Sequence, residues 1–324
     1  MLHAVKKPVF WIAAMFAAAV PAFAADQEAG TVIREVPMYV SPDVTAQRVA
    51  VVTRGRDVAL VMGRSNVGGN SWAHVFVKVD VGLTSEKDVS GWIESRYLVT
   101  PATPNADQVI FGEAVDSENQ AEQRAGRRHA AEDAMRLYYR LYQYWPNSPL
   151  AGEALWRTAD IRWQLEKAGV IQRPSIHELS PDVRTQIDDE LMKEIRKKFA
   201  QTKWADLAAY DMIDNKICFD WKGEASCPEK EAEIYEKYSR EHPQSPKAGE
   251  ALYNAAYRQA ALVDIYKSYH QQDKAERARK KALELTQEII SRFPDGDWKA
   301  RAANLAYALQ QNIAVYGNGA SGSN

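Results

Sequence analysis

Residues 137–156 read LYYRLYQYWPNSPLAGEALW, and residues 234–253 read IYEKYSREHPQSPKAGEALY, aligned without a gap. In both stretches an aromatic residue or histidine precedes a proline, which disfavours the helical conformation at that residue, so one helix ends there. The serine that follows can cap the next helix, with Pro149 or Pro246 at its first position, where a missing N–H costs nothing. The repeat therefore predicts helix–turn–helix units over the larger part of the chain.

A third, weaker copy occupies residues 289–300, which read IISRFPDGDWKA. The small residues after each turn, such as Gly152 and Gly249, let a neighbouring helix approach closely. The copies resemble tetratricopeptide repeats, in the form found in TolA-binding envelope proteins and in the lipoprotein subunit of the outer-membrane barrel assembly machine. The resemblance implies an all-α, tetratricopeptide-like helical array over residues 118–316 that binds envelope proteins or peptides.

The spacing of the copies is irregular, because the first two lie much farther apart than one repeat of about 34 residues. Between them, apolar residues recur at helical spacing after a Ser-Pro start, and they predict at least one further amphipathic helix over residues 183–199. Aromatic side chains are dense in the first copy. Tyr139 and Tyr144 are the candidates for an exposed surface that holds a partner peptide. The alternative is that such rings fill the space between helices.

Residues 30–101 follow a different pattern, in which short runs of alternating apolar residues are separated by turn residues. Five or so short strands in this length predict a small closed barrel, which leaves no exposed sheet edge. The segments 38–42, 52–58, 71–75 and 91–98 resemble, in that order, the bacterial SH3 domains of envelope proteins. Residues 80–90 are longer and more polar than the hairpin usual in that family, so we expect an inserted loop there. The fold class is therefore multidomain, an all-β SH3-like barrel followed by an all-α helical array.

Bacterial SH3 domains often bind cell-wall peptides or serve as spacers, so the second resemblance implies a ligand surface. Its aromatic candidates are Tyr39, Trp72, Trp92 and Tyr97, because exposed rings offer a large contact area at low entropic cost. The alternative is that most of these rings fill the interior of the barrel or cover its ends. A small domain needs such rings for its core.

The first 24 residues have the layout of a secretory signal peptide. Lys6 and Lys7 precede an uncharged run from residue 9 to residue 20, which is shorter than the roughly 20 residues needed to span a bilayer. Ala22-Phe23-Ala24 forms a small-x-small cleavage signal. We expect cleavage after Ala24 and a soluble protein in the periplasm. No cysteine lies near this site, so a lipoprotein is not expected, and no later stretch predicts a transmembrane anchor.

Two segments at the domain edges have the composition of irregular structure. Residues 102–117 follow a Pro-rich stretch and are assigned as a linker between the barrel and the array. Residues 317–324 are rich in glycine, serine and asparagine, and we expect them to form a disordered tail.

The sequence has two cysteines, Cys218 and Cys227. In an oxidising compartment such a pair favours a disulfide over a metal or redox site, and the turn formers between them let the two ends meet. We expect a local bond in a helix–helix loop that contributes about 2–3 kcal/mol through chain entropy. The alternative is a catalytic thiol with His242 or His270 as its base.

The charge and the motifs favour an interaction protein over an enzyme. Removal of residues 1–24 takes away two lysines and no acid, so the formal charge moves from -2 to -4, which disfavours nucleic acid as a partner. No catalytic, metal-binding or phosphate-binding motif stands out, so no cofactor is expected. The leading hypothesis is a periplasmic scaffold. The alternatives are a peptidoglycan-binding protein and a wall-remodelling enzyme.

Overall fold

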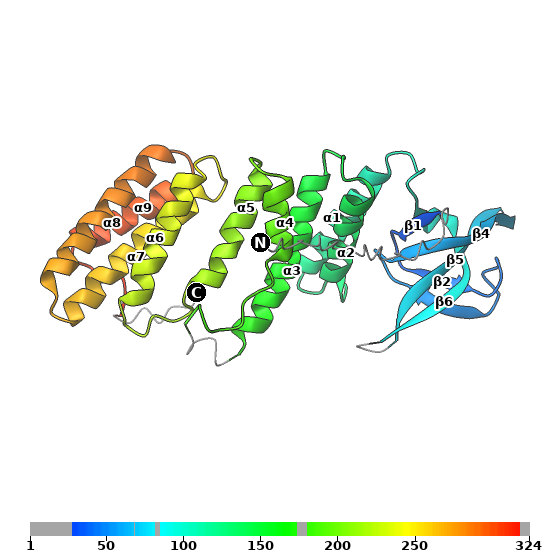
Figure 1. Ribbon diagram of the computed structural model, residues 1–324, viewed down its shortest axis with the longest axis horizontal. Helices are drawn as coiled ribbons and strands as arrows, with labels where there is room; N and C mark the ends of the chain where they lie inside the picture. The colour runs from blue at the N-terminus through cyan, green and yellow to red at the C-terminus, as the bar shows by residue number, and fades with distance from the viewer. Residues whose placement is uncertain (1–27, 68, 82–84, 174–179, 318–324) are drawn as a thin grey trace, which may run out of the picture.

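A computed structural model describes residues 28–67, 69–81, 85–173 and 180–317. It has two parts, an N-terminal curled antiparallel sheet and a C-terminal region with nine α-helices in the described ranges. Figure 1 shows the sheet at one end of an elongated body and helices α8 and α9 at the other. The predicted signal peptide and almost all of the predicted tail lie outside the described residues. Within the described residues, no helix combines the length and the apolar character needed to span a membrane.

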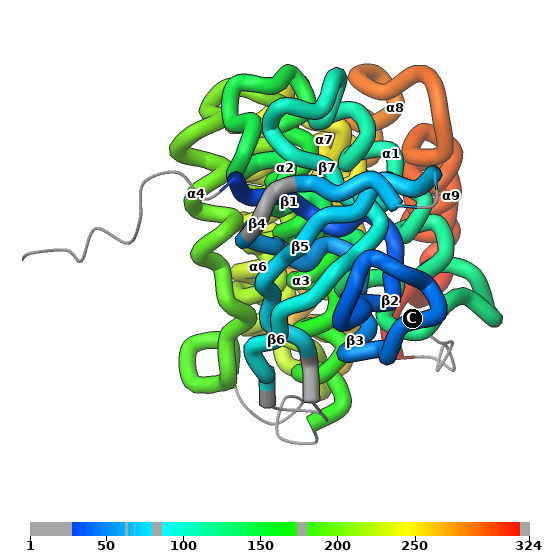
Figure 2. The backbone as a smooth tube through the Cα atoms, turned by 90° about the vertical axis from the view of Figure 1, so that its right-hand side faces the viewer, coloured from blue at the N-terminus to red at the C-terminus, as the bar shows by residue number. Residues whose placement is uncertain are grey.

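The β domain is one seven-stranded sheet in the order β3-β2-β6-β5-β4-β1-β7. Side chains alternate across it, and Ala73, Val75 and Ile93 belong to a hydrophobic core that lines the concave side. Figure 2, viewed from this end of the molecule, shows the strands in front of the helices. The strands are β1 (Ala29–Val32), β2 (Val36–Tyr39), β3 (Arg48–Val52), β4 (Asp57–Val67), β5 (Asn70–Val81), β6 (Ser85–Glu94) and β7 (Leu98–Val99).

Two sequence predictions for this domain need correction. The predicted closed barrel is an open, curled sheet, because no pairing joins its end strands β3 and β7 among the described residues. Strand β7 is only two residues long, and the chain continues from it toward α1. The predicted inserted loop at 80–90 is largely strand, since β5 and β6 pair continuously from Trp72–Glu94 out to Val81–Ser85.

The helical region begins earlier than predicted. Helix α1 starts at Ala106, so most of the segment assigned as a linker is helical, with its apolar residues Ile110 and Ala114 buried against α2. The helices are α1 (Ala106–Glu122), α2 (Ala130–Tyr144), α3 (Ala151–Ile171), α4 (Glu190–Lys198), α5 (Lys203–Asp211), α6 (Ser226–Glu241), α7 (Ala248–Ser268), α8 (Gln272–Arg292) and α9 (Asp297–Gln310). A short 3-10 helix, η3 (Met212–Lys216), follows α5.

Helices α2–α5 and α6–α9 form two equivalent four-helix units, which we call unit 1 and unit 2. The two predicted repeat copies span the α2–α3 and α6–α7 turns. In both turns the serine lies two residues before the N-cap and not at it as predicted, and Ser148 and Ser245 accept hydrogen bonds from the backbone N–H groups of the N-cap residues Leu150 and Lys247. The third copy is the α8–α9 turn.

Each unit has its own hydrophobic core, and the division falls within α5. Ala208 and Met212 belong to the core of unit 1 and α1, whereas Ala209, Tyr210 and Ile213 pack with unit 2. Helix α5 therefore has one face in each core, and the contacts between the units run through this helix and the residues just after it.

The β domain is docked on α1 and α2 by a turn between β3 and β4. The Arg54 guanidinium donates to Ser117 Oγ at 3.1 Å and lies 3.7 Å from Glu113, and Arg140 pairs with Asp57 at 2.8 Å. The Arg136 side chain donates to the Arg54 carbonyl. Charged contacts thus fix the orientation of the sheet on the first two helices.

Candidate functional site

The convex side of the β5–β6 hairpin carries a row of aromatic and polar side chains, here called the aromatic face. In register, Trp72 lies opposite Glu94, His74 lies opposite Trp92, and Trp92 lies opposite Tyr39 on β2. Directly opposed residues share one face of a sheet, and the alternate residues of the same strands form the core on the other side. The sheet register therefore brings three of the four predicted aromatic residues together.

The rings of this face contact one another. The centroids of Tyr39 and Trp72 lie 5.9 Å apart in an edge-on arrangement, and those of His74 and Trp92 lie 5.0 Å apart. Trp72 is only 1% exposed and Tyr39 is also buried, so these two correspond to the alternative that the rings fill the domain. Trp92 and His74 are partly exposed and are the residues that a ligand could contact first.

Polar atoms beneath the aromatic face lack partners. The Trp72 indole N–H and His74 Nδ1 are buried, and neither has a hydrogen-bond partner within the described ranges. A buried polar atom without a partner costs free energy. A ligand that accepts from the Trp72 N–H would remove part of that cost, while the Trp92 ring would supply apolar contact area.

Tyr97 does not join this face. It ends the 3-10 turn η1 (Ser95–Tyr97), and its ring packs against the concave core. The Arg96 guanidinium lies 5.0 Å from the Tyr97 ring centroid, and the Tyr97 carbonyl accepts a hydrogen bond from the Ile33 N–H. The partly exposed ring supports the end of the sheet.

The two tyrosines predicted for the helical surface have different surroundings. Tyr139 is partly buried, packs against the core of unit 1, and lies 6.2 Å from the Tyr142 ring. The Tyr144 hydroxyl bonds to Asp57 of the β domain, and burial raises the pKa of Tyr144. Tyr144 is therefore a contact between the two parts of the protein.

The predicted disulfide is confirmed. Cys218, just after η3, and Cys227, in the first turn of α6, are bonded with an S–S distance of 2.00 Å. The Glu231 carboxylate lies beside them and is 1% exposed. These three residues are also the single group within the described residues that offers three closely spaced metal ligands. Because the two sulfurs are bonded to each other, they are not available to a metal in this state.

A cluster of carboxylates was missed by the sequence interpretation. Asp160 on α3, Asp211 at the end of α5 and Asp214 in η3 gather where unit 1 meets unit 2. Burial, together with the charges of Asp160 and Asp214, raises the pKa of Asp211 to about 7. Burial also raises the pKa of Asp160. The three-residue spacing of Asp211 and Asp214 on one helical face was a signal, but their proximity to Asp160 depends on tertiary structure.

The acids of this cluster are unequally neutralised. Asp214 accepts from Lys167 at 2.7 Å and from the Trp163 indole at 3.0 Å. Asp160 accepts a hydrogen bond from the Gln164 side chain at 3.1 Å, and Oδ2 of Asp211 is buried without a hydrogen-bond partner in the part of the chain that the structure describes. The uneven pairing explains why Asp160 and Asp211 hold their protons more tightly than an exposed aspartate does.

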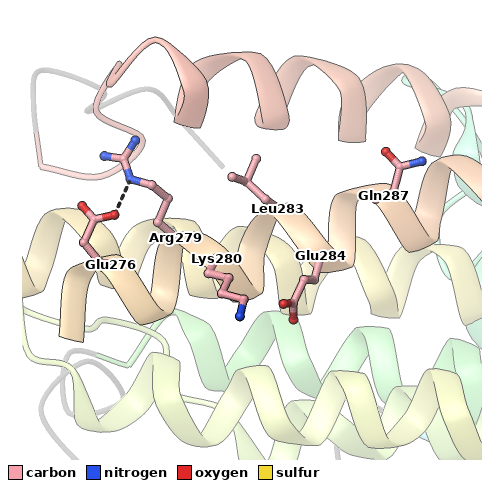
Figure 3. Close-up of a pocket in the computed structure, with 6 residues that line it drawn as sticks. All are labelled: Glu276, Arg279, Lys280, Leu283, Glu284 and Gln287. Carbon is pink, nitrogen blue, oxygen red and sulfur yellow. Dashed lines mark ion pairs between the residues drawn. The ribbon is translucent and has the colours of Figure 1, made fainter. Parts of the chain in front are cut away.

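A hollow of about 550 Å³ lies along α8, and Figure 3 shows the side chains that line it. Arg279 already donates to the Leu309 carbonyl and the Asn312 side chain, which hold the end of α9. All of the residues that line the hollow come from α8, so the hollow does not bring groups from different elements together. The lining residues are Glu276, Arg279, Lys280, Leu283, Glu284 and Gln287.

The chain matches no model of a known protein family, and a comparison with curated proteins finds no match either. The functional assignment therefore rests on the residues and the geometry described above.

Proposed function

We propose that this chain is an exported periplasmic scaffold that binds envelope proteins through a tetratricopeptide-like array and an SH3-like domain. The observation that carries the proposal is the succession of two equivalent four-helix units beside a docked β domain. Stacked helical units offer an extended surface to a partner, and a docked second domain holds a second surface at a fixed position. The signal-peptide pattern of residues 1–24 supports the periplasmic location.

Crosslinking followed by affinity capture tests this proposal. The tagged protein lacking residues 1–24 is incubated with envelope extract, crosslinked and captured, beside a Tyr139→Ala variant of the array and a Trp92→Ala variant of the β domain. Asp295→Asn, in the exposed α8–α9 turn, is the matched control. We expect the control to capture the same partners as the unmodified protein. We expect at least one of the two folded variants to lose some of these partners. Recovery of the same proteins with every variant, or of none, contradicts a scaffold that works through these surfaces.

The second candidate function is binding of peptidoglycan by the aromatic face. The observation that favours it is that the partly exposed Trp92 ring lies on the same face of the sheet as the unpartnered Trp72 N–H. Sedimentation with purified sacculi separates the two functions. Trp92→Ala is expected to abolish co-sedimentation, whereas Val44→Ala, which changes an exposed residue between β2 and β3, leaves it unchanged. Wild-type protein that stays in the supernatant removes this candidate, and release of muropeptides in the same assay would instead indicate an enzyme.

A further inference from the structure

The disulfide ties a loop, residues 217–225, to the first turn of α6, and this loop contacts both four-helix units. Phe219 packs against the core of unit 1, and the Arg184 guanidinium lies 4.4 Å from its ring centroid. Arg184 also donates to the carbonyls of Asp214 and Ile217. On the other side, Ile217 packs against the core of unit 2. The loop therefore forms part of the contact between the units.

The same loop holds the C-terminal segment against unit 2. The Trp221 ring centroid lies 5.4 Å from that of Tyr316, and the Gly223 N–H donates to the Tyr316 hydroxyl at 3.1 Å. The backbone N–H groups of Val315 and Tyr316 donate to Asp264 on α7, at 2.7 and 2.9 Å. Residues that are far apart in sequence thus depend on the shape of one short loop.

A buried carboxylate fixes that shape. Glu231, on the first turns of α6, accepts from the Cys218 N–H at 2.8 Å and from the Trp221 indole, and it pairs with Arg258 on α7 at 2.8 Å. A buried charge is tolerated only while its partners stay in place. The disulfide joins Cys218 to Cys227, one helical turn before Glu231, and so keeps the Cys218 N–H beside the carboxylate.

The units have a second attachment at the other end of α5. The Tyr238 hydroxyl donates to the Asp206 carbonyl at 2.7 Å, and His242 Nδ1 lies 2.7 Å from the Asp206 carboxylate. Asp206 and the disulfide loop are separated by roughly 15–20 Å along α5 and η3, at the rise per residue of such helices. Loss of the loop attachment would leave unit 2 held on α5 and η3, through Asp206 and through the packing of Tyr210 and Ile213.

We propose that the Cys218–Cys227 disulfide is a redox-dependent lock on the relative orientation of units 1 and 2. A dithiol reductant is oxidised to its own disulfide, and the Cys218–Cys227 bond takes up two electrons and two protons to give two thiols. The ends of the loop are then no longer joined, so Glu231 loses its hydrogen bond from the Cys218 N–H. The loop then separates from Arg184 and Tyr316. Unit 2 gains freedom to turn relative to unit 1 about its remaining contacts with α5. This inference stands independently of the proposed scaffold function.

Hydrogen exchange and small-angle X-ray scattering test the lock on the full mature chain. Reduction with dithiothreitol is expected to speed amide exchange about tenfold or more in residues 213–225 and 313–316, because the closed loop loses its entropic constraint. Exchange in α3 and α8 stays the same. The pair-distance distribution from scattering extends to longer distances, because the angle between the units varies.

Two variants keep the test decisive. A Cys218→Ser, Cys227→Ser protein should show the fast exchange without reductant and no further change when dithiothreitol is added. Glu231→Gln, with the disulfide intact, should speed exchange at residue 221 and in residues 313–316 less than reduction does. Unchanged exchange in the loop and the C-terminal segment after reduction overturns the proposal. Equal loss of protection throughout both units overturns it as well, because the bond would then stabilise the whole array.

Discussion

Gly152 on α3 provides the space that the indole ring of Trp204 on α5 occupies. A Cβ atom at Gly152 would lie 2.9 Å from Trp204 Cδ1 and 3.1 Å from Phe199 Cδ1. The same relationship recurs in unit 2, where a Cβ at Gly249 would lie 3.0 Å from Trp298 Cδ1. In both units this tryptophan also packs on an α3 or α7 aromatic ring, with centroids 5.4 and 5.5 Å apart. The small residue of the repeat therefore sets how closely the second and fourth helices of a unit approach.

Replacement of Gly152 by alanine should destabilise unit 1. The added methyl group forces the Trp204 and Phe199 rings to move, at a cost of about 1–3 kcal/mol, which exceeds the ~1 kcal/mol that alanine gains in a helix. Urea unfolding followed by tryptophan fluorescence measures the difference. Gly169→Ala, in the same helix but with open space around the new Cβ, is the matched control and should be neutral or stabilising. Equal behaviour of the two variants would contradict this packing.

Replacement of Gly55 by alanine should separate the β domain from the helices. Gly55 has a φ of +71°, and its new Cβ would lie 2.6 Å from Arg136 Cβ. Alanine pays about 1–2 kcal/mol for the left-handed conformation and a further cost for the overlap with α2. We expect two thermal transitions in place of one, and faster proteolysis between residues 99 and 106.

Gly69→Ala separates the two costs of that change. Gly69 has a φ of +82° with nothing within 4 Å of the new Cβ, so this variant pays for the backbone alone. It should lower stability while the two parts stay docked. Undocking of the β domain in Gly69→Ala, or a Gly55→Ala protein in which the domain stays docked, would contradict this explanation.

The helical repeat was predictable because its turn chemistry is local. Proline, serine and small residues recur at fixed offsets, and the structure has a helix–turn–helix at each predicted copy. A fourth copy was missed at the α4–α5 turn. It lacks the proline, but Phe199 and Trp204 have the same five-residue spacing as Phe293 and Trp298. The first two rings pack on Gly152 as the second two pack on Gly249.

Other features depended on contacts that the sequence does not display. The stripe over residues 183–199 predicted one helix, yet α4 starts at Glu190 and Val183 is 66% exposed. Trp72 follows the alternating pattern of a surface ring but is buried beside Tyr39. Asp160 and Asp211 come from different helices, so their mutual effect on pKa arises only after folding. The disulfide was predictable because the presence of two cysteines and the predicted export signal favoured it.

Asp211 should make the stability of the array fall as pH rises. Its pKa is raised from 3.8 to about 7, so the folded protein holds a proton that the unfolded chain has lost between these values. This contribution is fully present below pH 3.8, declines by up to about 1.4 kcal/mol per pH unit, and is gone above pH 7. Asp211→Asn mimics the neutral form and should raise stability at pH 8 and flatten the dependence between pH 5 and 7.

Urea unfolding at several pH values measures this effect, with the exposed Asp295→Asn as the control and Asp214→Asn as a comparison with a paired acid. Asp214 is paired with Lys167, so its replacement should lower stability at pH 8. An Asp211→Asn protein that is less stable than wild type at pH 8, or that keeps the full pH slope, would show that the Asp211 carboxylate is satisfied in its surroundings.

Asn215 explains why the chain before α4 is not helical, and its replacement should release that segment. Its side-chain amide accepts from the Ile187 N–H at 2.9 Å and donates to the Ile187 carbonyl at 2.8 Å, so this backbone is satisfied without a helix. Asn215→Ala leaves both groups without their partner, at a cost of about 1–3 kcal/mol. Hydrogen exchange should become faster in residues 185–189, whereas the exposed turn variant Asn147→Ala changes nothing there. Unchanged protection at Ile187 in Asn215→Ala would mean that other contacts hold this segment.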